Sequence, residues 1–290
     1  MKAIWKRELT SLFHNVIAWL FLGVTLFLFG LYFFVYNLSY GYPYIAYSLS
    51  AISFIFLITV PVLTMRVLAE ERRARTDQLL LTSPVSVGKI VFGKFLALAT
   101  IYTISVLVIC IAPVVLLLFG EIPVLETYVA IFGFWLYGLA CIAIGEFVSS
   151  LTESQVISAV ITFALLFGGY MMQSITGLIS SSGNLLTRIL GCYDLLSPLE
   201  DLMSGSFSLT AVVYYLSLIG LCLFLTTQVI QKRRWTVSRR KISLSVFSVG
   251  TVAAGMAIVV GLNAGMAMLP ETWTSFDVTD QKLYSITDDT

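Results

Sequence analysis

MRVLAEERRARTDQLLLTSPVSVGKIVFGK, residues 65–94, interrupts a sequence that is otherwise mostly apolar. The stretch combines a block of charged residues, a short leucine run and a Ser-Pro break before the next apolar segment. A loop that only joined two membrane spans could be a handful of polar residues. The ordered pattern therefore predicts a structured segment that a soluble partner contacts, and it makes the chain a candidate membrane protein driven by that partner.

The composition of the chain indicates an integral membrane protein. Hydrophobic residues make up 58% and charged residues 11% of the sequence, whereas a soluble domain usually carries about 25% charged residues. No continuous basic face on a soluble domain is present, so nucleic acid is not expected as a partner. The four cysteines have no paired spacing, which supports neither a disulfide framework nor a metal site.

Seven uncharged apolar segments have the length of about 20 residues that a membrane-spanning helix needs. They are Val16–Tyr36, Tyr44–Met65, Phe95–Phe119, Thr127–Gly145, Gln155–Gln173, Leu209–Ile230 and Ile242–Met268. Pro61 and Pro113 lie inside two of them, where we expect kinks. The predicted fold class is therefore all-α integral membrane. The seventh segment contains Gly261 and Gly265 in a GxxxG pattern, which could pack closely against another helix.

The basic residues orient these spans. If the N-terminus is cytosolic, all 17 Lys and Arg residues except Arg188 and Lys282 lie on the cytosolic side. We therefore expect a multi-pass protein with its N-terminus in the cytosol and its C-terminus outside. The outer segments are acidic, with Glu121, Glu126, Asp194, Glu200, Asp201, Asp277, Asp280, Asp288 and Asp289.

Residues 1–15 predict an amphipathic helix lying at the membrane surface, although a solvated extension of the first span is an open alternative. Apolar residues gather on one helical face and charged residues on the other, with Trp5 and Arg7 as representative interfacial residues. The apolar set is Ile4, Trp5, Leu9, Leu12 and Phe13, and the opposite set is Lys2, Lys6, Arg7 and Glu8.

Three further segments are distinct from the spans. Residues 173–208 form a long outer segment whose Leu and Ile spacing allows short helices. Residues 232–241 form a basic cytosolic linker, which suits a topology anchor. Residues 269–290 form a polar outer tail that resembles the start of an outside domain rather than a finished terminus.

No catalytic or nucleotide-binding signature is present: the chain lacks GxxxxGK[ST], HExxH and GxSxG motifs. Glu146 is the one acid inside an apolar run, and intramembrane carboxylates are often functional. Two interpretations stay open for it: a structural one, in which it pairs with a basic loop residue or reaches the headgroups, and a role in gating. His14 is expected to pack at the interface.

The interrupting segment itself allows two interpretations. Leucines at 79–81 form a short apolar patch beside the charged block, and Ser83-Pro84 should end one helix before Ser86 caps the next. The patch could dock into a groove on a soluble motor. Alternatively, its leucines face lipid.

PVLTMRVLAEERRARTDQLLLTSPVSVGKIVFGKFLA, residues 61–97, is similar to the loop after the second span of ABC-2 type permeases, and most similar to the gliding-motility-associated and copper-processing branch. The shared pattern is Pro61, Arg66, Glu70, Glu71, Arg72, Leu79–Pro84, Gly93 and Lys94. The chain departs at Thr76, preceded by Arg75, where relatives commonly have Gly-Thr. The turn there is expected to be tighter or more helical. FVSSLTESQVISAVITFALL, residues 147–166, resembles the entry to the fifth span of the same family.

The resemblance covers roughly residues 1–231 and implies a six-span permease core at 16–231. In that family the segment 66–94 acts as a coupling helix, and the segment 173–208 forms an outer helical hairpin. The implied ATPase-coupling residues are Arg66, Glu70, Glu71, Arg72, Leu79, Leu80, Leu81 and Pro84. The seventh span, 242–268, departs from the simple pattern, and SFDVTDQKLYSIT after it resembles the opening of a gliding-associated auxiliary domain.

The resemblance implies the membrane subunit of an ATP-driven exporter in a bacterial cytoplasmic membrane. Its partners would be a cytosolic ABC ATPase dimer, a second permease half, membrane lipids and an outer-side auxiliary protein or domain. The chain itself would be no enzyme and hold no cofactor, because ATP and Mg would bind the partner ATPase. Two alternatives remain: a proton-coupled secondary transporter using Glu146, and a non-transporting anchor or assembly factor for an outer-side complex.

Overall fold

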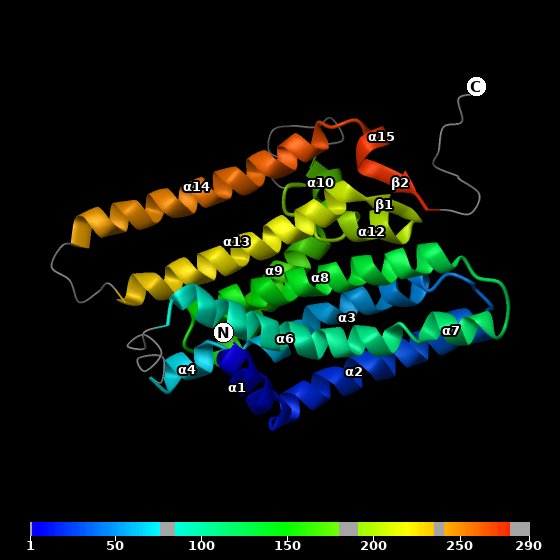
Figure 1. Cartoon of the computed structure of the whole chain (residues 1–290), viewed down its shortest axis with the longest axis horizontal. Helices are drawn as coiled ribbons and strands as arrows, with labels where there is room; N and C mark the ends of the chain where they lie inside the picture. The colour runs from blue at the N-terminus through cyan, green and yellow to red at the C-terminus, as the bar shows by residue number, and fades with distance from the viewer. Residues whose placement is uncertain (1, 76–84, 180–190, 235–240, 279–290) are drawn as a thin grey trace.

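The computed structural model describes residues 2–75, 85–179, 191–234 and 241–278, and helices dominate it (Figure 1). The helices are α1 (Lys2–Phe13), α2 (Val16–Phe33), the π-helix η1 (Phe34–Ser39), α3 (Ala46–Thr64), α4 (Ala69–Arg73), α6 (Val87–Ile109), α7 (Ala112–Leu117), α8 (Val124–Leu151), α9 (Gln155–Tyr170), α10 (Met172–Ile179), α12 (Ser197–Met203), α13 (Leu209–Arg234), α14 (Lys241–Ala267) and α15 (Glu271–Thr274). Two short strands, β1 (Ser206–Ser208) and β2 (Ser275–Asp277), pair antiparallel.

The described residues contain six helical stretches that are long and apolar enough to cross a membrane, or seven if the bent pair α9–α10 is one span. The six are Val16–Ser39, Ala46–Arg73, Val87–Leu117, Val124–Leu151, Leu209–Lys232 and Gly250–Ala267. Helices α9 and α10 meet at an angle of 57°. The prediction of an all-α membrane protein is confirmed, and each of the seven predicted apolar segments corresponds to one of these stretches.

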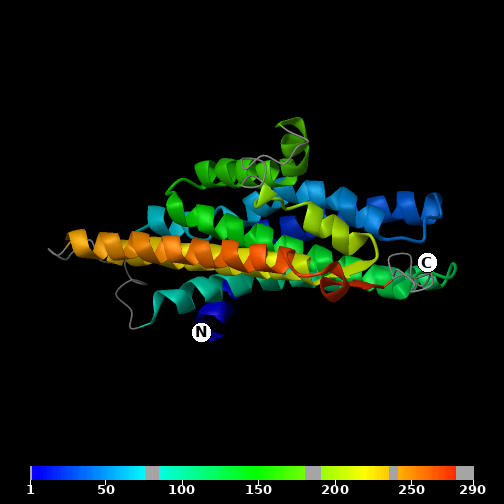
Figure 2. The ribbon, with the colours of Figure 1, turned by 90° about the horizontal axis from the view of Figure 1, so that it is seen from above.

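Helix α8 lies at the centre of the molecule. It packs against α3, α6, α9, α12 and α13, while α14 lies at the edge and packs against α13 (Figure 1). Viewed from above, α9 and α10 project from one side of the layer that the other long helices form (Figure 2). Because the apolar faces of α8 meet neighbours on most sides, its residues supply much of the buried core.

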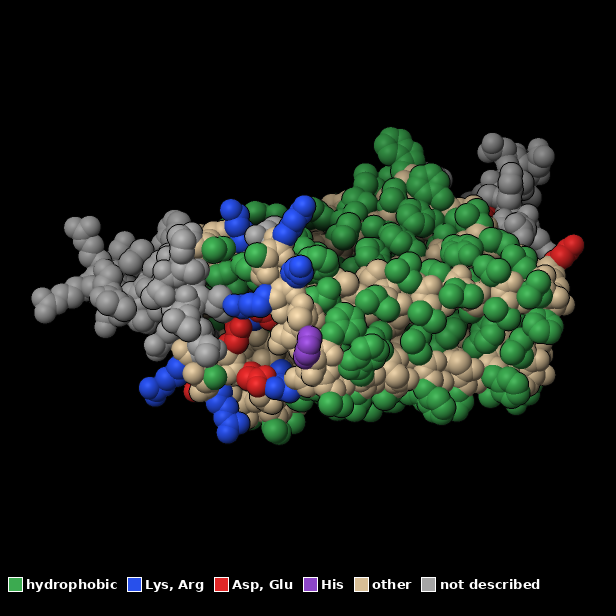
Figure 3. All heavy atoms as spheres, turned by 60° about the horizontal axis from the view of Figure 1, so that its bottom comes forward, with side chains coloured by type: hydrophobic (Ala, Val, Ile, Leu, Met, Phe, Trp, Pro, Cys, Tyr) green, Lys and Arg blue, Asp and Glu red, His purple; other side chains and the backbone are tan. Residues whose placement is uncertain are grey.

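The two ends of the helix bundle differ in charge. Lysine and arginine side chains gather at the end that contains α1 and α4, which we call the basic end, and the long middle is covered by hydrophobic side chains (Figure 3). The opposite end contains α12, and its acids include Glu121, Glu126 and Glu200; we call it the acidic end. This distribution is the one expected of a protein whose middle contacts lipid.

The helix of the third span begins directly after Ser86, as expected, and so before the apolar segment Phe95–Phe119. Helix α6 begins at Val87, so Lys89 and Lys94, both assigned to the loop, lie on its first turns. The span is then broken before Pro113, as predicted, because α6 ends at Ile109 and Pro113 lies in the first turn of α7. A proline is tolerated there because first-turn N–H groups have no partner within the helix.

The acidic end contains structure that the sequence only partly predicted. Short helices α10 and α12 cover parts of the segment 173–208, where short helices were predicted, and residues 180–190 between them are outside the described part. The β1–β2 pair was not predicted: Phe207 lies opposite Phe276, and the N–H of Val278 donates to the carbonyl of Gly205 at 3.1 Å. This pairing ties the residues after α14 to the start of α13.

Candidate functional site

The charged block of the opening motif forms α4, a helix of five residues that follows α3 after a short turn. The N–H of Ala74 donates to the carbonyl of Glu70 at 2.9 Å and closes the helix. Arg75 then has a φ of 56°, a left-handed conformation that favours glycine. The expected departure from a plain helical continuation is therefore present at Arg75, in a backbone conformation that a glycine would adopt without strain.

Ser149, near the end of α8, caps the start of α4. Its fully buried hydroxyl accepts hydrogen bonds from the backbone N–H groups of Leu68 and Ala69, both at 3.1 Å, and donates to the carbonyl of Met65 at 3.2 Å. The first N–H groups of a helix have no partner within the helix, so a side chain must supply one. Here that side chain comes from a distant part of the sequence, which fixes α4 to α8.

Arg72 makes a second link to the same region. Its guanidinium donates to the carbonyl of Leu151 at 2.7 Å and pairs with Glu153 at 2.9 Å. The fold thus places the charged block in direct contact with the start of the segment 147–166. Arg72 therefore faces the α8–α9 connection.

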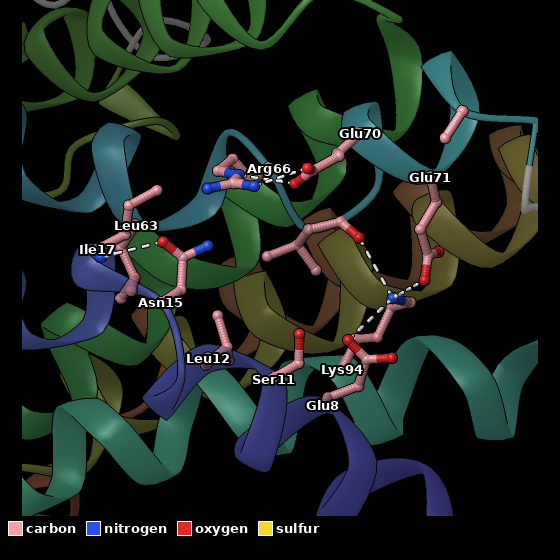
Figure 4. Close-up of a pocket in the computed structure, with 12 residues that line it drawn as sticks. Glu8, Ser11, Leu12, Asn15, Ile17, Leu63, Arg66, Glu70, Glu71 and Lys94 are labelled. Atoms are coloured by element: carbon pink, nitrogen blue, oxygen red, sulfur yellow. Dashed lines mark hydrogen bonds and ion pairs between the residues drawn. The ribbon is translucent and has the colours of Figure 1, made fainter.

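Lys94 on α6 is the most buried charge at this end, with 1% of its side chain exposed. Its ammonium donates to Glu71 Oε1 at 2.8 Å and to the Val67 carbonyl at 3.2 Å, and it pairs with Glu8 Oε2 at 3.3 Å (Figure 4). Three elements, α1, α4 and α6, thus meet at one cation. Removing one acidic partner of a buried cation strongly destabilises the folded protein, because the cation is left buried without compensation.

Helix α1 packs against α6 through Gly93 and Trp5. A Cβ at Gly93 would lie 3.0 Å from Cγ2 of Ile4, so a larger residue there would push α1 away. The indole of Trp5 donates to the hydroxyl of Thr100 at 3.0 Å. The placement of Glu8 on the charged face was wrong, because Glu8 shares the packed face and reaches Lys94.

Arg7 stays on the exposed side of α1, and its guanidinium pairs with Glu8 at 2.6 Å and lies 3.8 Å from Glu71. The hydrogen bond to Glu8 raises the pKa of Arg7 above its usual value. Arg7 therefore remains positively charged and adds a second cation to the Lys94 cluster, which we define as Arg7, Glu8, Glu71 and Lys94.

A cavity of about 350 Å³ opens beside this cluster (Figure 4). It lies between α1, the end of α3, α4 and the start of α6, and its lining is partly charged. The lining residues are Glu8, Ser11, Leu12, Asn15, Ile17, Leu63, Arg66, Val67, Glu70, Glu71, Ala74 and Lys94. Arg66 forms a two-pronged pair with Glu70 at the cavity wall, with both N–O distances 2.6 Å.

A family model described as ABC-2 family transporter protein matches residues 31–229 of the chain, more than half of its length. The chain belongs to the ABC-2 transporter family. A comparison with curated proteins found no match. The match includes α3, α4, α6 and α8, so the contacts around α4 lie within the family region of this multi-pass membrane protein.

The predicted coupling residues of this ABC-2 chain are only partly brought together. Glu71 turns inward to Lys94, Arg72 pairs with Glu153 at the surface, and Glu70 pairs locally with Arg66 and is half-exposed. The remaining predicted coupling residues, Leu79, Leu80, Leu81 and Pro84, lie outside the described residues.

Glu146 is fully buried on α8, and neither of its carboxylate oxygens has a hydrogen-bond partner among the described residues. The predicted pairing with a basic loop residue is absent from the described part, because Lys94, the cation that acts on Glu146, is bound elsewhere. Reaching the headgroups is excluded by its complete burial.

Sequence reasoning missed four residues of the site: Glu8, Lys94, Ser149 and Glu153. One signal was available, since Lys94 follows Gly93 and precedes a long apolar run, a position where a cation needs a partner. The other three became visible only when the fold joined them to α4. Among the described residues, no group of three or more His, Cys, Asp or Glu side chains is placed to hold a metal ion.

Proposed function

We propose that this chain is the membrane-spanning subunit of an ATP-driven exporter, in which a separate cytosolic ATPase contacts residues 66–94 and drives outward movement of substrate. Movement of α4 would be transmitted to the membrane-spanning helices. These helices would then open the substrate path alternately to one side of the membrane and to the other. The observation that carries this proposal is the bonding of α4 to α6, α8 and the α8–α9 connection through Glu71, Ser149 and Arg72.

This bonding has a mechanical consequence. A force applied to α4 cannot be absorbed by a loose loop, because α4 is joined to side chains from helices on two sides of it. Packed cores respond to such a force by moving as bodies rather than by continuous deformation. In this proposal Glu71 and Arg72 transmit the movement, and Arg66, Glu70 and residues 79–84 meet the motor.

The basic end lies in the cytosol under this proposal, and the acidic end lies outside. The support is the charge asymmetry, since the described Lys and Arg side chains occur on or beside α1, α4, the first turns of α6 and the end of α13. The location is then a bacterial cytoplasmic membrane with the N-terminus inside. The partners are an ABC ATPase dimer carrying ATP and Mg, and a second permease half.

Affinity purification of the full chain from native membranes, followed by measurement of ATPase activity and export, tests the proposal. The double variant Glu70→Ala with Arg72→Ala, and separately Leu79→Glu with Leu80→Glu, should lose export while the protein still folds. Glu121→Ala, at the acidic end, is the control and should export normally. Normal export by both double variants would overturn the proposed coupling role.

A charge exchange separates internal transmission from direct motor contact. Arg72→Glu should uncouple the transporter, and adding Glu153→Arg should restore export, because the swapped pair can re-form the ion pair now measured at 2.9 Å. If the swapped pair stays uncoupled while it folds normally, Arg72 acts through the motor rather than through Glu153.

The buried carboxyl of Glu146, which has no hydrogen-bond partner in the described part of the chain, favours one second candidate, a proton-coupled secondary transporter. Transport driven by a pH gradient in vesicles that lack the ATPase would support it. The anchor alternative predicts instead that deleting everything after Gln231 abolishes function while the six-span part is dispensable.

A further inference from the structure

Glu146 has a buried carboxyl group inside the helix bundle. The proposed coupling of α4 to the spans does not involve this group. It lies on α8 with none of its surface exposed, and both oxygens lack a hydrogen-bond partner among the described residues. An ionised carboxylate in that position would incur a large desolvation cost without compensation. A neutral carboxyl incurs a much smaller one.

The nearby cation is fully engaged by other groups. An ammonium carries three hydrogens, and the Lys94 ammonium has three oxygen partners, from Glu71, Val67 and Glu8. Lys94 acts on Glu146 electrostatically but does not bond to it. In this conformation, therefore, Lys94 cannot also neutralise Glu146 by a direct bond.

The charges of the Lys94 cluster already balance. Two cations, Arg7 and Lys94, face two carboxylates, Glu8 and Glu71, in the contacts described here. An ionised Glu146 would add a third negative charge next to this balanced set. Among the described residues, Glu8 and Cys222 on α13 also interact electrostatically with Glu146, and neither offers a positive charge.

We propose that Glu146 is a proton-binding site whose alternative counter-charge is Lys94. Glu146 holds its proton while Lys94 is bound to Glu8 and Glu71. When α1 and α4 move apart, the Lys94 ammonium turns to Glu146, and the O–H bond of the Glu146 carboxyl breaks. The proton then passes to solvent, and the ion pair formed keeps the site neutral. The proton assignment concerns the isolated chain and does not depend on the identity of the motor.

Infrared difference spectroscopy of the purified full chain tests this site. The wild-type spectrum minus the Glu146→Gln spectrum should contain the C=O stretch of a protonated carboxyl at neutral pH. Glu146→Gln should keep the wild-type unfolding temperature, because glutamine has the shape of the neutral acid. Absence of that band from the difference spectrum, or a large fall in the unfolding temperature of Glu146→Gln, overturns the proton assignment.

A second experiment, with a matched control, tests whether the Lys94 ammonium changes its partner from Glu71 and Glu8 to Glu146. Glu71→Gln removes one carboxylate from Lys94, so the band assigned to Glu146 should be lost at the same pH. Glu70→Gln, the adjacent acid that pairs with Arg66, should leave the band unchanged. If Glu71→Gln does not fold, Glu8→Gln serves as the second variant. A band of full intensity in the folded variant overturns the exchange.

Discussion

Helices α8 and α14 are both apolar and long enough to cross a membrane, yet the fold uses them differently. The mean hydropathy is 1.9 for the apolar window of Val124–Leu151 in α8 and 1.5 for Gly250–Ala267 in α14. Of the apolar window of α8, 78% is buried inside the structure, while none of the corresponding window of α14 is. Hydropathy reports that a helix prefers an apolar environment, but protein and lipid both satisfy that preference.

The glycines of the two helices show the reason for the difference. A Cβ at Gly138 on α8 would overlap the ring of Tyr102, and one at Gly133 would lie 2.7 Å from Cβ of Leu202. Gly261 and Gly265 on α14 have nothing within 4 Å of such a Cβ. Gly261 and Gly265 therefore make no close helix contact within the described residues, although Gly255 on the same helix lies close to Phe224 on α13, whereas Gly133 and Gly138 of α8 both meet neighbouring side chains.

The largest effect should come from Gly138→Ala. The added methyl group must displace Tyr102, whose hydroxyl donates to the Phe134 carbonyl at 2.6 Å. We expect the unfolding free energy to fall by about 1–3 kcal/mol, the usual cost of overpacking. Thermal unfolding in detergent, followed by tryptophan fluorescence, measures it.

Gly261→Ala is the matched control on α14. Because its Cβ would meet open space, the substitution should be neutral or stabilise by up to about 1 kcal/mol through helix propensity. Equal losses in the two alanine variants would contradict the division between a central α8 and a peripheral α14.

The next effect should come from Ser149→Ala, which removes the link between α8 and α4. The N–H groups of Leu68 and Ala69 then lose their buried acceptor, which should cost about 1–3 kcal/mol. The same unfolding measurement applies, and export should fall with it if α4 transmits movement.

Ser158→Ala provides the comparison for Ser149. Ser158 is equally buried, on α9, but its hydroxyl has no hydrogen-bond partner among the described residues. Its removal should be neutral or slightly stabilising. A loss as large as that of Ser149→Ala would mean that burial alone, and not the cap of α4, sets the cost.

The smallest effect should come from Asn263→Leu on α14. The Asn263 amide donates to the hydroxyl of Ser217 on α13 at 2.8 Å. Side-chain hydrogen bonds between membrane helices contribute about 0.6 kcal/mol on average. A double-mutant cycle with Ser217→Ala measures this coupling, and a value of several kcal/mol would show that α14 is held as firmly as α8.

The coupling segment shows where prediction from the sequence succeeded and where it failed. The helix start after Ser86 was expected from local residue types, and the structure contains it, while the charged block forms α4 and is followed by the left-handed residue Arg75. The Ser86 side chain, however, makes no capping hydrogen bond. Local sequence patterns indicate which backbone conformation a segment prefers. They do not indicate which hydroxyl or carboxylate group forms the hydrogen bond.

The partners of the charged block could not be predicted in this way. Glu71 bonds to Lys94, which lies 23 residues later, and Arg72 donates to Leu151, which lies 79 residues later. Sequence spacing carries information about neighbours on one helix, not about side chains from different helices. Glu71 and Arg72 therefore seemed available to a motor, although each is bonded to another part of the same chain.

The sequence by itself determined that this protein is helical, spans a membrane several times and concentrates positive charge at one end. These properties follow from residue composition and from the order of apolar and charged segments, which act along the chain. Only the tertiary structure decided that α8 is central and α14 peripheral, that Lys94 joins α1, α4 and α6, and that Glu146 is buried without a hydrogen-bond partner among the described residues. Those properties depend on contacts between residues distant in the sequence, and such contacts exist only after the helices have packed.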